Sequence, residues 1–93
     1  MAAMTTPLNE QERVHYNRVI WHSRRGMLEL DLVLEPYVKN RYLELGEQDR
    51  ERYCRLLTCE DQQLFNWFLN KEPVDDPELA EIVQNILEYS KSR

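Results

Sequence analysis

The chain has 93 residues, of which 42% are hydrophobic and 31% charged, and its net charge is −5 at pH 7. This length fits one domain, since domains usually span about 50 to 250 residues, and the apolar content is too high for a disordered chain. Residues 1–25 carry four arginines against two glutamates (+2), whereas residues 26–93 carry 8 basic against 15 acidic residues (−7). The acidic balance argues against a general nucleic-acid binder, because contacts with phosphate dominate such affinity.

Residues that direct a chain to a membrane or an oxidising compartment are lacking. No apolar run approaches the roughly 18 residues of a membrane span, and no signal peptide is visible. Residues 1–12 contain no Arg or Lys, the reverse of a mitochondrial presequence. Cys54 and Cys59 are too few for a disulfide scaffold. We therefore expect a protein of the reducing cytoplasm that does not insert into membranes.

Strand-like alternation is weak, and the few glycines and prolines fall mostly where helices should begin or end. We therefore predict an all-α fold, a small bundle of about five short helices formed by a single domain over residues 1–93, with residues 1–7 flexible. The first helix is expected over residues 8–22, started by Thr6 and Pro7 or else by Asn9. Its apolar side is expected to consist of Val14, Tyr16, Ile20 and Trp21.

Ser23 is predicted to be the N-cap of a longer second helix over residues 24–45. Pro36 lies inside that segment, where it removes one backbone hydrogen bond and clashes with the preceding turn. We expect a kink there, although a break is the alternative. The predicted buried face has apolar residues at three- and four-residue spacing: Met27, Leu30, Leu34, Tyr37 and Val38.

Three further helices follow. Gly46 ends the second helix or caps the third, predicted over residues 47–57 with Tyr53, Leu56 and Leu57 buried. Thr58 and Asp61 resemble a capping box that opens a fourth helix ending near residue 70. Its aromatic run, residues 65–68, is interpreted as core rather than as a docking patch. Asp76 as N-cap and Pro77 at the first helical position open the last helix.

No spacing of reactive side chains indicates catalysis or a metal centre. Cys54 and Cys59 are five residues apart and His15 and His22 seven, which does not fit the close pairs of structural zinc sites. A Cys–His pair for nucleophilic catalysis remains open, but nothing in the sequence places either histidine near either cysteine. Acidic pairs stand at predicted helix starts, where they complement the helix dipole. We therefore expect a protein that is not an enzyme and holds no metal.

The run from Arg24 to Asp31 is not explained by local rules. Gly26 in a first helical turn costs up to about 1 kcal/mol relative to alanine. One physical use for a glycine there is close approach by a partner backbone or ligand. Arg24 and Arg25 beside unpaired helical N–H groups would suit a carboxylate or phosphate. Arg25 and Glu29 are expected on one helix face. The alternative is an exposed helix corner at which Gly26 merely eases the turn.

The stretch Trp21-His22-Ser23-Arg24-Arg25-Gly26-Met27-Leu28-Glu29-Leu30-Asp31 resembles the RGxxE signature of the SdhE family, the succinate dehydrogenase flavinylation factors. The later segment from Leu56-Leu57 to Leu64-Phe65-Asn66-Trp67 is also similar to that family, as are the chain length and the five-helix pattern. The resemblance covers nearly all of the chain after Arg13. An acidic N-terminal extension and Leu28 inside the motif are its small departures.

The resemblance implies a chaperone-like factor that binds the flavoprotein subunit of succinate dehydrogenase, and of fumarate reductase, and promotes covalent attachment of FAD to it. The factor is expected to be a bacterial cytoplasmic monomer with no stably bound cofactor; whether it binds FAD directly stays open. An antitoxin-like interaction module and a helix-turn-helix nucleic-acid binder are the alternatives. The residues expected to bind the partner are Arg24, Arg25, Gly26, Met27, Glu29 and Asp31.

Overall fold

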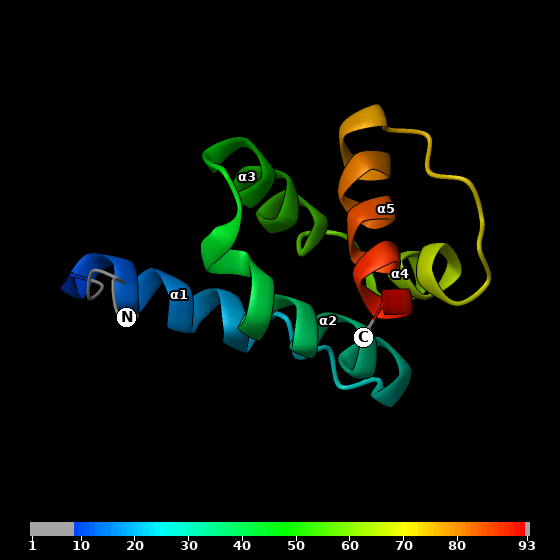
Figure 1. The fold of residues 1–93 in the computed structure, drawn as a ribbon. Coiled ribbons are helices and arrows are strands. Elements are labelled where there is room, and N and C mark those ends of the chain that lie inside the picture. The colour runs from blue at the N-terminus through cyan, green and yellow to red at the C-terminus, as the bar shows by residue number, and fades with distance from the viewer. Residues whose placement is uncertain (1–8, 93) are drawn as a thin grey trace.

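The computed structural model describes residues 9–92, and this part of the chain contains helices and no strand. The elements in chain order are α1 (Glu10–His22), α2 (Leu28–Arg41), the 3-10 turn η2 (Tyr42–Glu44), α3 (Glu47–Leu56), α4 (Asp61–Phe68) and α5 (Pro77–Ser92). The all-α class and the five helices predicted from the sequence are confirmed. Figure 1 shows α1 extending to one side, while α3, α4 and α5 gather along α2, which gives an elongated molecule of 40 × 24 × 24 Å.

Helix starts that carry a strong local signal lie where the sequence predicts them. Asn9 and Glu12 form a reciprocal capping box, in which each side chain accepts the other residue's backbone N–H, at 2.7 and 3.1 Å. Asp76 accepts the backbone N–H groups of Glu78 and Leu79 at the start of α5. Arg55 donates to Asp76 at 2.8 Å, and this bond, with those backbone bonds, holds the pKa of the Asp76 carboxyl below its ordinary value. The alternative start at Thr6 and Pro7 lies outside the described residues.

The apolar side predicted for α1 is wrong in part. Val14 and Trp21 are 52% and 70% exposed, and the buried residue of this helix is Val19. Tyr16 and Ile20 are half-buried against the core. The reason is that α1 packs mainly on α2 and leaves most of its circumference in solvent, as Figure 1 shows.

The predicted start of the second helix at residue 24 is also wrong. Ser23 is the C-cap of α1, and its hydroxyl donates to the carbonyl oxygen of Val19 at 2.8 Å. The Ser23 hydroxyl oxygen also lies 2.7 Å from the Tyr53 hydroxyl. Tyr53 must be the donor in this bond, because the serine proton is already donated to Val19. Ser23 is thus fully buried and cannot cap a following helix, so α2 begins at Leu28, four residues after its predicted start at residue 24. It continues through Pro36 without a break and ends at Arg41.

The capping box predicted for Thr58 and Asp61 does not form. The Thr58 hydroxyl donates to the carbonyl oxygen of Arg55 at 2.6 Å, and α4 begins at Asp61 with Glu60 as its N-cap. Gly46 is the N-cap of α3, which is one of the two roles expected for it.

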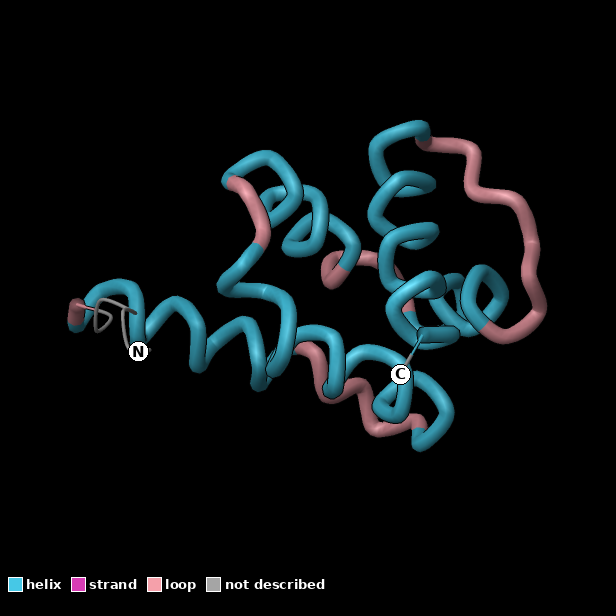
Figure 2. Tube along the Cα trace, viewed as in Figure 1, coloured by secondary structure: helices cyan, strands magenta, loops and turns pink. Residues whose placement is uncertain are grey.

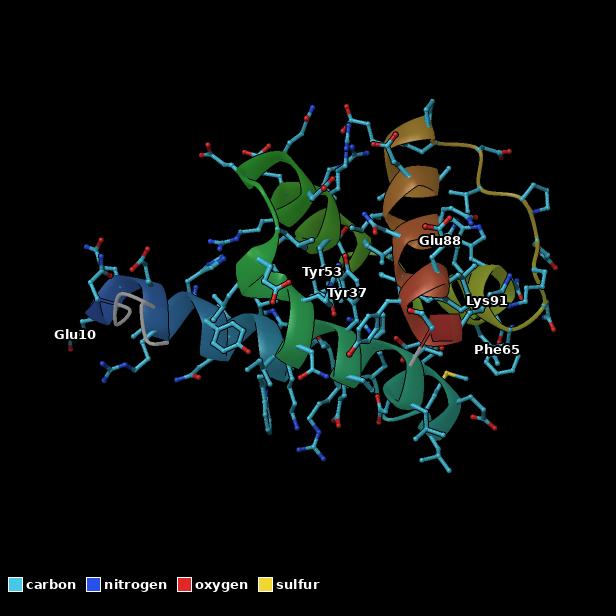
Figure 3. All side chains as sticks on the ribbon, viewed as in Figure 1. Glu10, Tyr37, Tyr53, Phe65, Glu88 and Lys91 are labelled. Carbon is cyan, nitrogen blue, oxygen red and sulfur yellow. The ribbon has the colours of Figure 1, made fainter. Side chains whose placement is uncertain are left out.

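The core lies where α2, α3 and α5 meet. Tyr37 from α2 and Tyr53 from α3 lie side by side there, with ring centroids 5.8 Å apart (Figure 3). Trp67 and Phe68 of α4 are buried as well, so the core interpretation of these two aromatic residues is confirmed. Met27, from the predicted face of the second helix, is half-buried, and the other four are fully buried: Leu30, Leu34, Tyr37 and Val38.

Candidate functional site

The segment that joins α1 to α2 contains Arg25 and Gly26 of the RGxxE motif, and Glu29 follows in the first turn of α2. We call residues 24–29 the charged turn. Figure 2 draws its first part as a loop running beside α2. Gly26 has a φ of +81°, a backbone angle that residues with a Cβ rarely adopt. A Cβ built on Gly26 would meet nothing within 4 Å. The backbone of the turn therefore requires glycine here, while the space around it is open to solvent.

The Arg25 side chain is folded inward and is only 16% exposed. Its Nε donates to the Asp61 carboxylate at 2.8 Å, across 36 residues of sequence. Its terminal nitrogens donate at 3.0 Å to the carbonyl oxygens that surround them, those of His22, Leu57 and Cys59. All but one of the N–H groups of the guanidinium are thereby used within the molecule.

The backbone of the turn is fastened to the start of α2. The N–H of Arg25 donates to the Asp31 carboxylate at 2.8 Å, so this aspartate closes the loop that contains Gly26. Met27 is the N-cap residue of α2, and its half-buried side chain packs against the core. Asp31 and Met27 therefore fix the turn from inside.

Arg24 and Glu29 lie on the outside of the turn. The Arg24 side chain is 60% exposed and forms an ion pair with Glu35 of α2 at 3.1 Å. Glu29 is exposed in the first turn of α2, and its carboxylate has no hydrogen-bond or ion-pair partner within residues 9–92. The expectation that Arg25 and Glu29 share one helix face is wrong, because Arg25 precedes the helix and pairs with Asp61.

The structure adds exposed apolar side chains that the sequence reasoning did not assign to the site. Leu28 and Leu32 are 69% and 59% exposed and lie four residues apart on the outer face of α2, on either side of Glu29 in sequence. Trp21, at the end of α1 just before the turn, is also exposed. The signal of Leu28 and Leu32 in the sequence was their position off the buried stripe that contains Leu30 and Leu34. Asp61 was missed too, since its position suggested only a helix cap.

His15 and Cys54, which the sequence could not place, meet at one side chain. His15 Nε2 lies 2.9 Å from the Tyr42 hydroxyl, and Cys54 Sγ lies 3.7 Å from it. These groups line a cleft of about 560 Å³ between α1 and α3.

The other cysteine, Cys59, is half-buried, and burial raises the pKa of its thiol above the ordinary value despite the nearby Arg25 and Arg55. Among the described residues, no three His, Cys, Asp or Glu are grouped so that they could hold a metal ion.

Fold and site together define a small helical bundle that presents a charged turn, held from inside by hydrogen bonds and flanked by exposed leucines. Residues 17–90 match the family described as the flavinator of succinate dehydrogenase. The chain is 52% identical over 77 residues to the FAD assembly factor SdhE of Pseudomonas putida, a match that covers 83% of this chain and 92% of the relative. It is 47% identical over 75 residues to the SdhE of Shewanella oneidensis (81% and 92% covered) and 41% identical over 87 residues to that of Idiomarina loihiensis (91% and 97% covered). The chain therefore belongs to this family of flavinylation factors.

Proposed function

We propose that this protein binds the flavoprotein subunit of succinate dehydrogenase and promotes covalent attachment of FAD to it, without being an enzyme itself. The observation that carries the proposal is that the family match, residues 17–90, includes the whole charged turn and the residues that support it. The names of the relatives, FAD assembly factors, agree with this role. The bond-forming chemistry then belongs to the flavin and its target subunit.

The exposed members of the charged turn are proposed to contact the subunit. Arg24 and Glu29 present opposite charges to solvent, and Gly26 between them lets a partner backbone come close, because it has no side chain. Met27 and Asp31 contribute by holding the first turn of α2 in place. The protein acts by positioning: it holds the subunit in a conformation in which the flavin and its attachment residue are close.

The described residues include no helix long and apolar enough to cross a membrane. We propose a bacterial cytoplasmic protein, in agreement with the bacterial origin of the relatives compared above. We further propose that it acts as a monomer, takes the flavoprotein subunit of fumarate reductase as a second client, and binds no cofactor stably.

Deletion of the gene tests this function directly. Without the protein, the dehydrogenase subunit is expected to lose most of its covalent flavin, seen as in-gel flavin fluorescence of the denatured subunit, and a plasmid copy is expected to restore it. Full flavinylation in the deletion strain would contradict the proposal. Recovery of a toxin in place of a flavoprotein with the tagged chain would favour the antitoxin-like alternative.

Replacing Glu29 by alanine is expected to lower flavin attachment about ten-fold or more, because a charged contact with the partner is lost. The free energy of unfolding should change by less than about 0.5 kcal/mol, because the carboxylate is exposed and has no partner within residues 9–92. The measurements are flavin fluorescence of the subunit in the deletion strain and a thermal melt of the purified variant. Undiminished fluorescence would refute the role of Glu29.

Replacing Leu28 by aspartate is expected to weaken binding of the flavoprotein subunit about ten-fold or more, because it places a charge in an apolar contact. Stability should hold, since Leu28 is 69% exposed and an acidic residue suits the first turn of a helix. Leu43→Asp is the matched control: Leu43 is 41% exposed in η2, away from the charged turn, and should leave the affinity unchanged. Equal losses of affinity in both variants would contradict a specific contact at Leu28.

A further inference from the structure

The Arg25 guanidinium joins segments that are distant in sequence. It spans from the end of α1, at the carbonyl oxygen of His22, to the connection between α3 and α4, where it meets Leu57, Cys59 and Asp61. Leu57 is the C-cap residue of α3, so its carbonyl oxygen has no partner within that helix, and Cys59 lies in the connection that follows. Arg25 therefore satisfies these acceptors while it anchors the segment that precedes Gly26.

Among residues 9–92, Asp61 supplies the one carboxylate paired with this guanidinium, at 2.8 Å. An arginine that is 16% exposed keeps its charge at low cost only if a carboxylate and well-placed acceptors surround it. The Asp61 side chain is 39% exposed and belongs to the first residue of α4, so it is fixed to a helix of the core rather than to the turn itself. Its place makes Asp61 the attachment point of the charged turn on the body of the molecule.

We infer that Asp61 is a positioning residue of the docking surface: through Arg25 it holds Gly26 and Glu29 in the arrangement in which they meet the flavoprotein subunit. The inference rests on the proposed function and assigns the arginine of the motif an internal role instead of a contact with the partner. The engaged N–H groups of Arg25 support this role, because a partner carboxylate would have to displace bonds that are already made.

Asp61→Ala is expected to weaken binding of the purified flavoprotein subunit about ten-fold or more, the size of effect that loss of a charged hydrogen bond has on an equilibrium. Asp61→Asn should retain most of the affinity, because the amide oxygen still accepts the Arg25 Nε–H. The matched control is Asp49→Ala, which removes a carboxylate 3.0 Å from Arg52, an arginine that is 14% exposed. That variant should bind as the unchanged chain does, since Arg52 lies on α3 and does not touch the turn.

Amide hydrogen exchange separates positioning from general destabilisation. In Asp61→Ala, exchange should speed up at residues 25–31 while the amides of α5 stay protected, and circular dichroism should stay native. Exchange that rises evenly over the whole chain, or not at all in residues 25–31, would overturn the inference. This measurement needs no partner, so it stands even if the unchanged chain fails to bind the flavoprotein, a result that would overturn the proposed function alone.

A double-mutant cycle decides whether Arg25 acts through Asp61 or by touching the partner. Arg25→Lys should weaken binding to a similar degree as Asp61→Ala, because lysine cannot reach the four acceptors with one ammonium group. The double variant should then bind little worse than either single variant. If the fold-losses of affinity in the two single variants multiply in the double variant, Arg25 contacts the partner independently of Asp61. That result would overturn the positioning role.

Discussion

Gly26→Arg is expected to abolish binding of the flavoprotein subunit while leaving the helical fold in place. The left-handed φ of +81° costs a residue with a Cβ about 1 to 2 kcal/mol, which a folded domain of this size can lose and remain folded. Nothing lies within 4 Å of the position of a Cβ, so the new side chain meets no clash inside the molecule. It points instead into open space, where the flavoprotein subunit is proposed to dock. The measurements are a pull-down of the subunit, circular dichroism and a thermal melt.

Smaller replacements separate backbone strain from added bulk. Asparagine tolerates the left-handed region better than other residues, whereas alanine adds strain with little volume. Gly26→Ala should therefore lower the melting temperature about as much as Gly26→Arg but keep measurable binding, and Gly26→Asn should be the more stable of the three variants. A collapsed fold in Gly26→Arg, or retained binding, would contradict the docking role of this position.

Raising the pH above about 10 is expected to unfold the protein steeply, because three tyrosine hydroxyls are buried. Burial raises the pKa of Tyr37 to about 12, with Asp49 adding to the shift. It also raises the pKa of Tyr42, helped by the Cys54 thiol, and that of Tyr53, well above the ordinary value of 10.0. In the unfolded chain these groups ionise near 10, so the folded state loses stability as the pH rises through the interval between the two pKa values.

The dependence of the free energy of unfolding on pH, which we call the alkaline slope, follows from proton linkage. Each tyrosine that has ionised only in the unfolded chain removes about 1.4 kcal/mol per pH unit, so three remove about 4 kcal/mol per unit above pH 10. Thermal melts between pH 7 and 12 should show a constant midpoint up to about pH 9, a slight fall as the Cys59 thiol ionises in the unfolded chain, and a sharp fall above about pH 10, with tyrosinate absorbance of the buried residues appearing together with loss of helix.

Tyr37→Phe gives the control for this effect. The Tyr37 hydroxyl has no hydrogen-bond partner within residues 9–92, so its removal should leave stability at neutral pH unchanged or slightly higher. The alkaline slope should fall by about one third, since one of three ionisations is gone. Tyr53→Phe, by contrast, breaks the bond to Ser23 and should cost about 1 kcal/mol at neutral pH. An alkaline slope that stays the same in Tyr37→Phe would contradict the assignment.

The helix pattern and the RGxxE run were readable from the sequence because both depend on neighbours in the chain. The start of the first helix at Asn9, one of the two starts expected for it, and the Asp76–Pro77 start of the last helix depend on residues close in the chain, and the structure confirms both. Leu30, Leu34, Tyr37 and Val38 fall on one face by helical spacing alone and are buried as predicted. The resemblance of the charged turn to a family, which the match over residues 17–90 confirms, required only the order of the residues.

Predictions from neighbouring residues were wrong where a side chain binds a residue that is distant in the sequence. Ser23 and Asp61 both have the residue types of helix caps, but Ser23 is buried against Tyr53, 30 residues on, and Asp61 binds Arg25, 36 residues back. No spacing rule foresees such pairs, because they exist only after α1, α3 and α4 have packed around α2. The sequence by itself thus determined five helices and the identity of a charged turn. The tertiary structure alone decided that Arg25 faces inward and that Arg24, Gly26 and Glu29 face outward, because folding brings together the carbonyl and carboxylate groups that bind the Arg25 guanidinium.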